Sequence, residues 1–148
     1  MSTPSPQCGP WTAKTCMASG SGGSAWLAEG PGGDALLKVA ESQDQRTSLC
    51  REVAILNRFH HSQVPALIDS DPDGAWLVRQ YVKGEELSSW APGRSYSEVV
   101  DVVADLAESL ASLHEAGIIH ADLKGSNVLV GPEGRAHLID LGISYLPE

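Results

Sequence analysis

The stretch Ile118–Ser144, IIHADLKGSNVLVGPEGRAHLIDLGIS, combines four polar side chains with two short apolar segments. Asp122, Lys124 and Asn127 lie in one short loop, and Asp140 follows the second apolar segment. The segments NVLV and AHLID flank the turn-forming GPEG, which predicts a hairpin. Asp and Asn also favour turns, but a turn preference does not account for the order of all four residues.

These four residue types suit phosphoryl transfer with a divalent cation. Carboxylate and amide oxygens are the ligands that hard cations prefer, so we expect Asp140 and Asn127 to hold Mg²⁺. In this interpretation Asp122 orients and deprotonates an attacking hydroxyl. Lys124 neutralises the charge that develops on the phosphoryl group. The segment therefore predicts a phosphotransferase site.

Two features upstream are ambiguous when each is taken alone. The turn Gly20-Ser21-Gly22-Gly23 is usual for a plain hairpin between two strands. Lys38 interrupts an apolar strand, as an edge-strand lysine does, or as a lysine with a buried partner does. Glu52, on the next predicted helix, is the candidate partner, although helix surfaces commonly carry Glu.

Alternating apolar residues and glycine-rich turns predict antiparallel strands in the first part of the chain. The expected strands are 12–19, 24–29, 34–40, 66–69 and 75–81. A helix is expected over 44–61, between the third and fourth strands, with Thr47 or Ser48 near its start. Its apolar face is predicted to contain Leu49, Val53 and Leu56.

A second helix is predicted over 97–116, with Ser97 as its N-cap and Gly117 at its end. Three- and four-residue steps predict one apolar face, made of Val99, Val103, Leu106, Leu110 and Leu113. The residues before it, 83–93, are expected to form a linker with at most one helical turn. Strands with one helix, then a long helix and a hairpin, indicate an α+β fold with two lobes.

Composition narrows the class of protein further. The 148 residues suffice for one domain, and the net charge of −9 argues against broad binding to nucleic acid or to anionic membranes. No apolar run reaches the roughly 20 residues of a membrane span, and the first residues show no basic region followed by an apolar one, so we expect no secretory signal. The three cysteines show no disulfide or zinc spacing. We expect a cytoplasmic protein.

The segment HADLKGSNVLV…LIDLG resembles the catalytic loop and metal-binding segment of the eukaryotic-like Ser/Thr protein kinase family, normally H-R-D-L-K-x-x-N and D-F-G. Upstream pieces follow in the family's order. GSGGSA resembles the glycine-rich phosphate loop, ALLK the strand with the conserved-type lysine, REVAIL the helix with Glu52, and LVRQYVKGEEL the hinge. The resemblance extends from about residue 12 to 146.

The resemblance implies a protein-kinase-like bilobal fold. Residues 12–80 would form an N-lobe with a five-stranded antiparallel sheet and one helix. Residues 81–148 would form the hinge and a much reduced C-lobe with the long helix, the catalytic loop and the metal-binding hairpin. Residues 1–11 are expected to be a flexible arm.

The resemblance also implies roles for individual residues, with ATP and Mg²⁺ as cofactors. Lys38 would contact the α- and β-phosphates and be positioned by Glu52, below a phosphate loop made of Gly20, Ser21, Gly22 and Gly23. The backbone of Gln80 and Val82 would pair with adenine, beside Arg79 at the gatekeeper position. Glu86, or its neighbour Glu85, would contact the ribose. The adenine ring would be sandwiched by Leu27, Leu36 and Leu129.

Four departures from the family pattern shape the functional prediction. Ala25 replaces the third loop glycine, Leu141 replaces the Phe of D-F-G, and Ala121 replaces the Arg that receives a phosphorylated activation loop. The pattern ends at Glu148, before the activation segment and the later helices. We therefore expect the long helix to expose apolar surface that self-association or a partner protein covers.

Three functional hypotheses follow. The first is a minimal ATP- and Mg-dependent Ser/Thr kinase acting on a protein or small hydroxyl substrate, since D-L-K is the pattern of Ser/Thr protein kinases. The second is a pseudokinase-like nucleotide-binding module that regulates a partner without turnover. The third is a fragment that does not fold alone.

Overall fold

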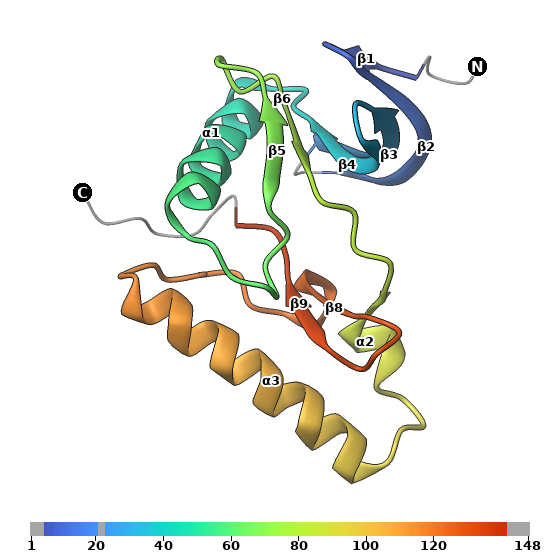
Figure 1. Cartoon of the computed structure of the whole chain (residues 1–148), viewed down its shortest axis with the longest axis vertical. Helices are drawn as coiled ribbons and strands as arrows, with labels where there is room; N and C mark the ends of the chain where they lie inside the picture. Colours follow the sequence, from blue (N-terminus) through green and yellow to red (C-terminus); the bar gives the residue numbers. More distant parts are fainter. Residues whose placement is uncertain (1–4, 21–22, 142–148) are drawn as a thin grey trace.

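The computed structural model describes residues 5–20 and 23–141 (Figure 1). A six-stranded antiparallel sheet has the spatial order β1-β2-β3-β4-β6-β5. Its strands are β1 Gln7–Cys8, β2 Trp11–Gly20, β3 Gly23–Gly30, β4 Gly33–Val39, β5 Leu67–Ser70 and β6 Trp76–Arg79. Helix α1, Gln43–Arg58, connects β4 to β5 and lies alongside β5 (Figure 1).

The second part of the molecule is built around a smaller sheet. Its three strands have the order β7-β8-β9, and α2, α3 and a 3₁₀ turn surround them (Figure 1). The elements are β7 Glu85–Glu86, α2 Leu87–Trp90, α3 Tyr96–Glu115, the 3₁₀ turn Gly125–Asn127, β8 Val128–Val130 and β9 Ala136–Leu138. The α+β, kinase-like arrangement is confirmed, and α2 is the single helical turn expected in the linker.

The first sheet has one strand more than the five predicted, because part of the expected loose arm is ordered. Gln7 and Cys8 pair with Thr12 and Trp11 around a turn in which Gly9 has φ 56°. Trp11 is only 2% exposed, and its indole N–H donates to Asp69 Oδ2 at 2.8 Å. The Pro-, Ser- and Gly-rich composition of the first residues predicted a loose arm, but the burial of Trp11 stabilises the pairing of β1 with β2.

Helix α1 begins one residue before the predicted segment 44–61 and ends at Arg58, three residues before the end of that segment. Ser42 is its N-cap, and the Ser42 side chain accepts the Gln45 N–H at 3.2 Å, so Thr47 and Ser48 lie inside the helix. The buried face of α1 consists of Leu49, Glu52, Ile55 and Leu56. A glutamate on this face is unusual and leads directly to the candidate site.

Helix α3 is rotated relative to its predicted apolar face. Ser95, not Ser97, caps it in a reciprocal capping box with Glu98. The buried positions are Val102, Leu106, Ser109 and Leu113, whereas Val103, placed on the buried face by the prediction, is 48% exposed. Valines at four nearby positions surround the first half of the helix, so periodicity alone could not select its buried face.

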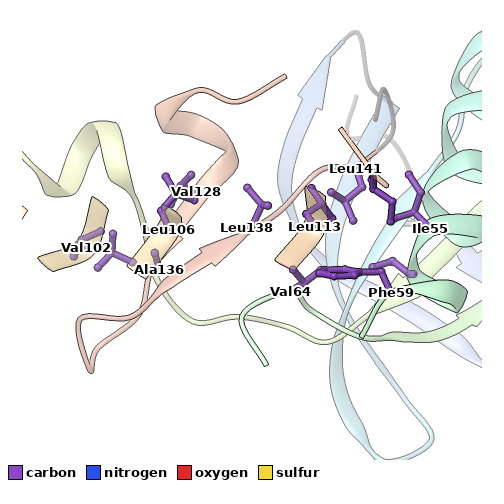
Figure 2. Close-up of a cluster of buried hydrophobic side chains, with 13 residues drawn as sticks. Ile55, Phe59, Val64, Val102, Leu106, Leu113, Val128, Ala136, Leu138 and Leu141 are labelled. Carbon is purple, nitrogen blue, oxygen red and sulfur yellow. The ribbon is translucent and has the colours of Figure 1, made fainter. Parts of the chain in front are cut away.

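One hydrophobic cluster connects the two parts of the molecule (Figure 2). Ile55 of α1 and Phe59, the residue after α1, belong to the same buried cluster as Leu113, Leu138 and Leu141. The connection is reinforced by the Leu138 N–H, which donates to the Gln63 carbonyl at 2.9 Å. The core therefore fixes α1 against the hairpin that carries Asp140. Within the described residues, the helices are too short or too polar to cross a membrane.

Candidate functional site

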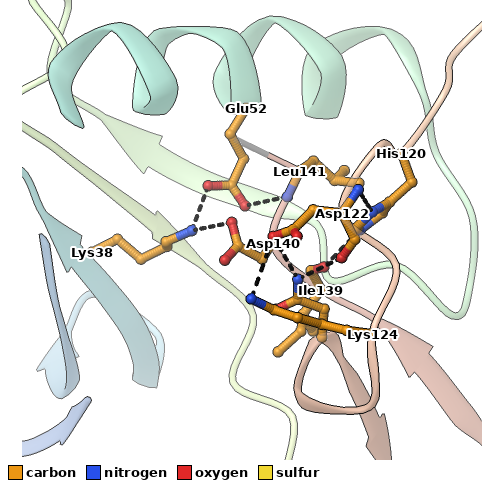
Figure 3. A network of polar contacts seen from close by, with 9 residues as sticks. Lys38, Glu52, His120, Asp122, Lys124, Ile139, Asp140 and Leu141 are labelled. Carbon is orange, nitrogen blue, oxygen red and sulfur yellow. Dashed lines mark hydrogen bonds and ion pairs between the residues drawn. The ribbon is translucent and has the colours of Figure 1, made fainter. Parts of the chain in front are cut away.

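Lys38 and Glu52 form a buried ion pair at the centre of the molecule (Figure 3). Lys38 Nζ lies 2.7 Å from Glu52 Oε2, with the lysine side chain 14% and the glutamate side chain 1% exposed. The other oxygen, Glu52 Oε1, accepts the Leu141 N–H at 3.4 Å. Because both carboxylate oxygens have partners, Glu52 fixes the Lys38 side chain relative to the backbone at Leu141.

Asp140 faces the same lysine from the smaller sheet. Its Oδ1 lies 3.5 Å from Lys38 Nζ, across 102 positions of sequence. The backbone of Asp140 has φ 61°, in the left-handed region that residues other than Gly, Asn and Asp seldom adopt. Such conformations concentrate at functional sites, where the surrounding structure holds them.

The loop before β8 is held by a chain of hydrogen bonds (Figure 3). The buried His120 ring contacts the Ile139 carbonyl through Nε2 at 3.1 Å and accepts the Asp122 N–H at Nδ1, 3.2 Å away. The Asn127 amide donates to the Asp122 carbonyl at 2.8 Å and to Asp122 Oδ2 at 3.0 Å. These bonds orient the Asp122 carboxylate and tie the loop to the strand end that carries Asp140.

Lys124 is the exposed cation of this loop. Its Nζ lies 3.8 Å from Asp122 Oδ2, with the side chains 59% and 33% exposed. Both Lys124 and Lys38 line a cleft of about 450 Å³ together with Asp140, Ser126, Gly20 and Gly23, and with the neighbouring Ala18, Ser19, Ser24 and Ala25. The predicted Ser21 and Gly22 lie outside the described residues.

The cleft brings Lys38, Lys124 and Asp140 together with the predicted phosphate loop, and the predicted base-side residues lie apart from it. Within the part of the chain that the structure describes, its lining does not include Glu52, Asp122 or Asn127, which reach it only through their contacts with the lining residues or their neighbours. Among the described residues, the lining of this cleft does not include Leu27, Leu36, Gln80, Val82, Glu86 or Leu129. Leu27 pairs with Leu36, and Glu86 pairs with Leu129 in the smaller sheet. Gln80 and Val82 border a separate surface cavity beside Tyr81. Their roles toward a nucleotide base remain predictions.

The donor set of the cleft fits a divalent cation bound together with phosphates. Asn127 uses its amide nitrogen in both of its side-chain hydrogen bonds, which leaves the side-chain oxygen for a cation. The Asn127 carbonyl accepts the Ile139 N–H at 3.0 Å, so this side chain lies next to the strand end bearing Asp140. No cluster of three or more His, Cys, Asp or Glu side chains occurs among the described residues. Phosphate oxygens would therefore complete the coordination of Mg²⁺.

One structural network behind the site was not predicted. Arg135 donates to both oxygens of Asp105 at 3.0 Å and to Gln63 Oε1 at 3.0 Å, and Asp105 also accepts the Ala136 N–H at 2.8 Å. Burial acts to raise the pKa of Asp105, but the hydrogen bonds from Arg135 and Ala136 outweigh it and lower this pKa. In the sequence, Arg135 lies 72 positions from Gln63 and 30 positions from Asp105, so no local pattern could reveal their contact.

Comparison with known proteins places these features in a family. The family model described as the protein kinase domain matches residues 35–147 of the chain. The chain is 33% identical over 154 residues to serine/threonine-protein kinase PkaB of Streptomyces coelicolor, covering 92% of this chain and 37% of that protein. It is 31% identical over 150 residues to probable serine/threonine-protein kinase PkwA of Thermomonospora curvata, covering 92% and 20%.

A third relative has a similar level of sequence identity over a shorter alignment. Serine/threonine-protein kinase pkn2 of Myxococcus xanthus is 37% identical over 109 residues, which cover 66% of this chain and 13% of that protein. The chain thus spans between 13% and 37% of the length of these relatives. With Lys38, Glu52 and Asp140 in contact and most of the chain matched to one domain, the chain belongs to the protein kinase domain family.

Proposed function

We propose that this chain is an ATP- and Mg-dependent phosphotransferase that transfers the γ-phosphate to a Ser or Thr hydroxyl. The observation that carries the proposal is the position of Lys38 Nζ, 2.7 Å from Glu52 and 3.5 Å from Asp140, in a cleft that Lys124 also lines. This arrangement brings a fixed cation and a metal-binding carboxylate to one place. A triphosphate needs the cation to neutralise its phosphates and the carboxylate to hold the metal ion that bridges them.

The polar residues in and beside the cleft each have a chemical task in this reaction. Lys38 would neutralise the non-transferred phosphates, and Asp140 and Asn127 would hold Mg²⁺. Bound Mg–ATP supplies the electrophilic phosphoryl group. Asp122 orients the attacking hydroxyl and accepts its proton, and Lys124 offsets the charge that develops nearby.

The names of the relatives and Lys124 support the proposed substrate class. PkaB, PkwA and pkn2 are named serine/threonine-protein kinases. A protein Ser or Thr hydroxyl is therefore the proposed acceptor, and a small molecule with a hydroxyl group is the alternative acceptor. The exposure of Lys124 and of Asp122 leaves room for either.

A transfer assay with radiolabelled phosphate tests this proposal. We expect wild type with Mg²⁺ and ATP to label itself or a Ser/Thr-rich protein substrate. Asp122→Asn should lower the rate by about 10²–10⁴, the usual contribution of a positioned base. Equal labelling by wild type, Asp122→Asn and Asp140→Ala would contradict the proposal.

A second candidate is a nucleotide-binding module that associates with a protein. It is favoured by the exposed apolar side chains Tyr96, Val100 and Val103 on α3 and by Ile119 and Leu123 near the catalytic loop. Self-association or a protein partner would cover this surface. Binding of Mg–ATP without transfer, together with a dimer or complex in light scattering, would support the module. A stable monomer that binds no apolar dye would contradict the association.

A further inference from the structure

Helix α3 presents two apolar faces, and the inner one packs against the rest of the described molecule. On this inner face, Val102, Leu106 and Leu113 belong to the buried cluster that includes residues of β8 and β9. Figure 1 shows α3 along the lower edge of the molecule, with β9 above it. The outer face carries large apolar side chains, namely Tyr96, Val100 and Val103, which are 87%, 42% and 48% exposed. Exposed apolar surface of this kind commonly marks a binding site.

The exposed apolar side chains form one row along the helix. Tyr96, Val100 and Val103 follow one another at steps of four and three residues, and the exposed Ala107 continues the row after a further step of four. Such steps keep side chains on one face of an α-helix, and a second helix packs against this spacing. At about 100° per residue, this apolar row lies about a third of the way round the helix from the buried residues. It is therefore a surface separate from the core.

The charge beside the apolar row has one sign. Helix α3 carries five carboxylates and no lysine or arginine, in a chain whose net charge is −9. Two of these carboxylates, Glu98 and Asp105, pair with Arg94 and Arg135. The other three form no ion pair among the described residues and recur every seven positions, at Asp101, Glu108 and Glu115. Seven residues make about two helical turns, so these three form an acidic row next to the apolar row.

These charges decide which kind of partner can cover the apolar row. The acidic row repels a nucleic acid or an anionic membrane surface. A second copy would bring another helix with five carboxylates and no lysine or arginine, and like charges that meet at an interface cost affinity. A helix with apolar residues at matching steps and basic residues beside them complements both rows at once.

We propose that the outer face of α3 docks a basic amphipathic helix of a partner protein. The apolar residues of that helix pack on the apolar row, and its lysines or arginines face the acidic row. The contact then has an apolar centre that supplies most of the affinity and a charged edge that selects the partner. The inference rests on the second candidate function, association with a protein, and names the chemistry of the partner.

Binding of three fluorescently labelled helical peptides of equal length tests the inference. The first peptide has leucines at three- and four-residue steps, with lysines and alanines between them. The second has glutamate in place of each lysine, and the third has the residues of the first in an order without the leucine spacing. In fluorescence anisotropy, we expect the first to bind wild type at least about tenfold more tightly than either of the others. Its affinity should fall as NaCl is raised from about 50 to 500 mM.

Variants of α3 locate the binding site. The double variant Val100→Ser, Val103→Ser should weaken binding of the first peptide by about tenfold or more and leave thermal unfolding nearly unchanged, since both side chains are exposed. Asp101→Asn with Glu115→Gln should reduce both the affinity and its dependence on salt. Glu108 is left in place, because its charge also helps to raise the pKa of Arg135. Met17→Ser on β2, at a side chain that is also 48% exposed, is the matched control and should change nothing.

The outcomes separate this inference from the proposed functions. Equal binding of the first and third peptides, or no binding of the first peptide to folded wild type, overturns it. Binding that survives in the folded valine variant overturns it as well; if that variant does not fold, the Asp101 and Glu115 variant decides. A wild-type dimer in light scattering that the valine variant abolishes would make a second copy the occupant, so the basic partner fails while association stands. Phosphoryl transfer is tested by the transfer assay and does not depend on these outcomes.

Discussion

Each of the two walls of the cleft contributes one lysine, Lys38 or Lys124, that pairs with a carboxylate behind the lining, and the two pairs differ in separation and exposure. On the upper wall, Lys38 and Glu52 are 2.7 Å apart and the glutamate is 1% exposed. On the lower wall, Lys124 and Asp122 are 3.8 Å apart and Lys124 is 59% exposed. The upper pair is fixed by the fold, and the lower pair is solvated.

This difference separates two tasks of a phosphotransferase. A buried pair is costly to desolvate but holds its atoms in place, so it suits a group that must wait in position for a phosphate. A solvated pair contributes little to stability and can exchange its partner for a substrate. Under the proposed function, the upper wall would position the phosphates and the lower wall would take part in the chemistry, and mutations should separate the two.

The largest effect is expected from breaking the upper pair. Glu52→Ala leaves Lys38 without its buried partner and removes the acceptor of the Leu141 N–H. The free energy of unfolding should fall by about 3–5 kcal/mol, as for other broken buried pairs. Denaturant unfolding measures this directly. A change below that of exposed-surface substitutions would show that the pair is not buried in solution.

The lower wall should respond in rate rather than in stability. Asp122→Asn keeps the size of the side chain and removes the base, so transfer should fall by about 10²–10⁴. The midpoint of thermal unfolding should move little. Loss of folding in this variant, without a specific loss of rate, would assign Asp122 to structure instead.

The network behind the walls should add pH dependence to stability. The folded state lowers the pKa of Asp105 below its ordinary 3.8, so its contribution is full above that value and is lost as pH falls through the lowered one. Asp105→Asn should cost roughly 1–3 kcal/mol at neutral pH, since Arg135 and the Ala136 N–H lose a charged acceptor.

Unfolding measured from pH 7 to pH 2 should show the difference between wild type and Asp105→Asn narrowing as the pH falls below about 3.8. A difference that is constant over this range would contradict the role of the Asp105 charge. Glu108→Gln, which changes a nearby exposed carboxyl of α3, serves as the matched control.

The smallest effect is expected from the solvated cation. Lys124→Met removes an exposed pair worth about 0–1 kcal/mol, so unfolding should be nearly unchanged. Transfer should nevertheless slow, because the charge next to the phosphoryl group is gone. Comparable losses of stability in Lys124→Met and Glu52→Ala would erase the distinction between the walls.

The sequence predicted the convergence of Lys38, Glu52 and Asp140, although 102 positions separate the first from the last. That prediction came from the order of motifs and their resemblance to a family. Patterns within single elements were less informative. The burial of Trp11 orders β1 in a segment whose composition predicted a loose arm.

Tertiary contacts decided the features that the sequence left open. Helix α3 has valines on several sides, and the bonds of Asp105 to the β9 segment fix which side faces the core. Arg79 was identified by its place in the motif order, but its burial depends on packing that no local pattern encodes. Contacts between residues that are distant in sequence depend on how the elements pack, and the periodicity of a single sequence describes only each element by itself.

The most direct test of the central claim is the Mg²⁺ dependence of triphosphate binding, measured by calorimetry on wild type, Lys38→Met and Asp140→Ala. ATP is titrated into each protein with and without Mg²⁺. We expect tight binding to wild type only with Mg²⁺, and strongly weakened binding to both variants. Binding of equal strength in all three proteins, or binding that ignores Mg²⁺, would contradict the convergence of Lys38 and Asp140 on one triphosphate.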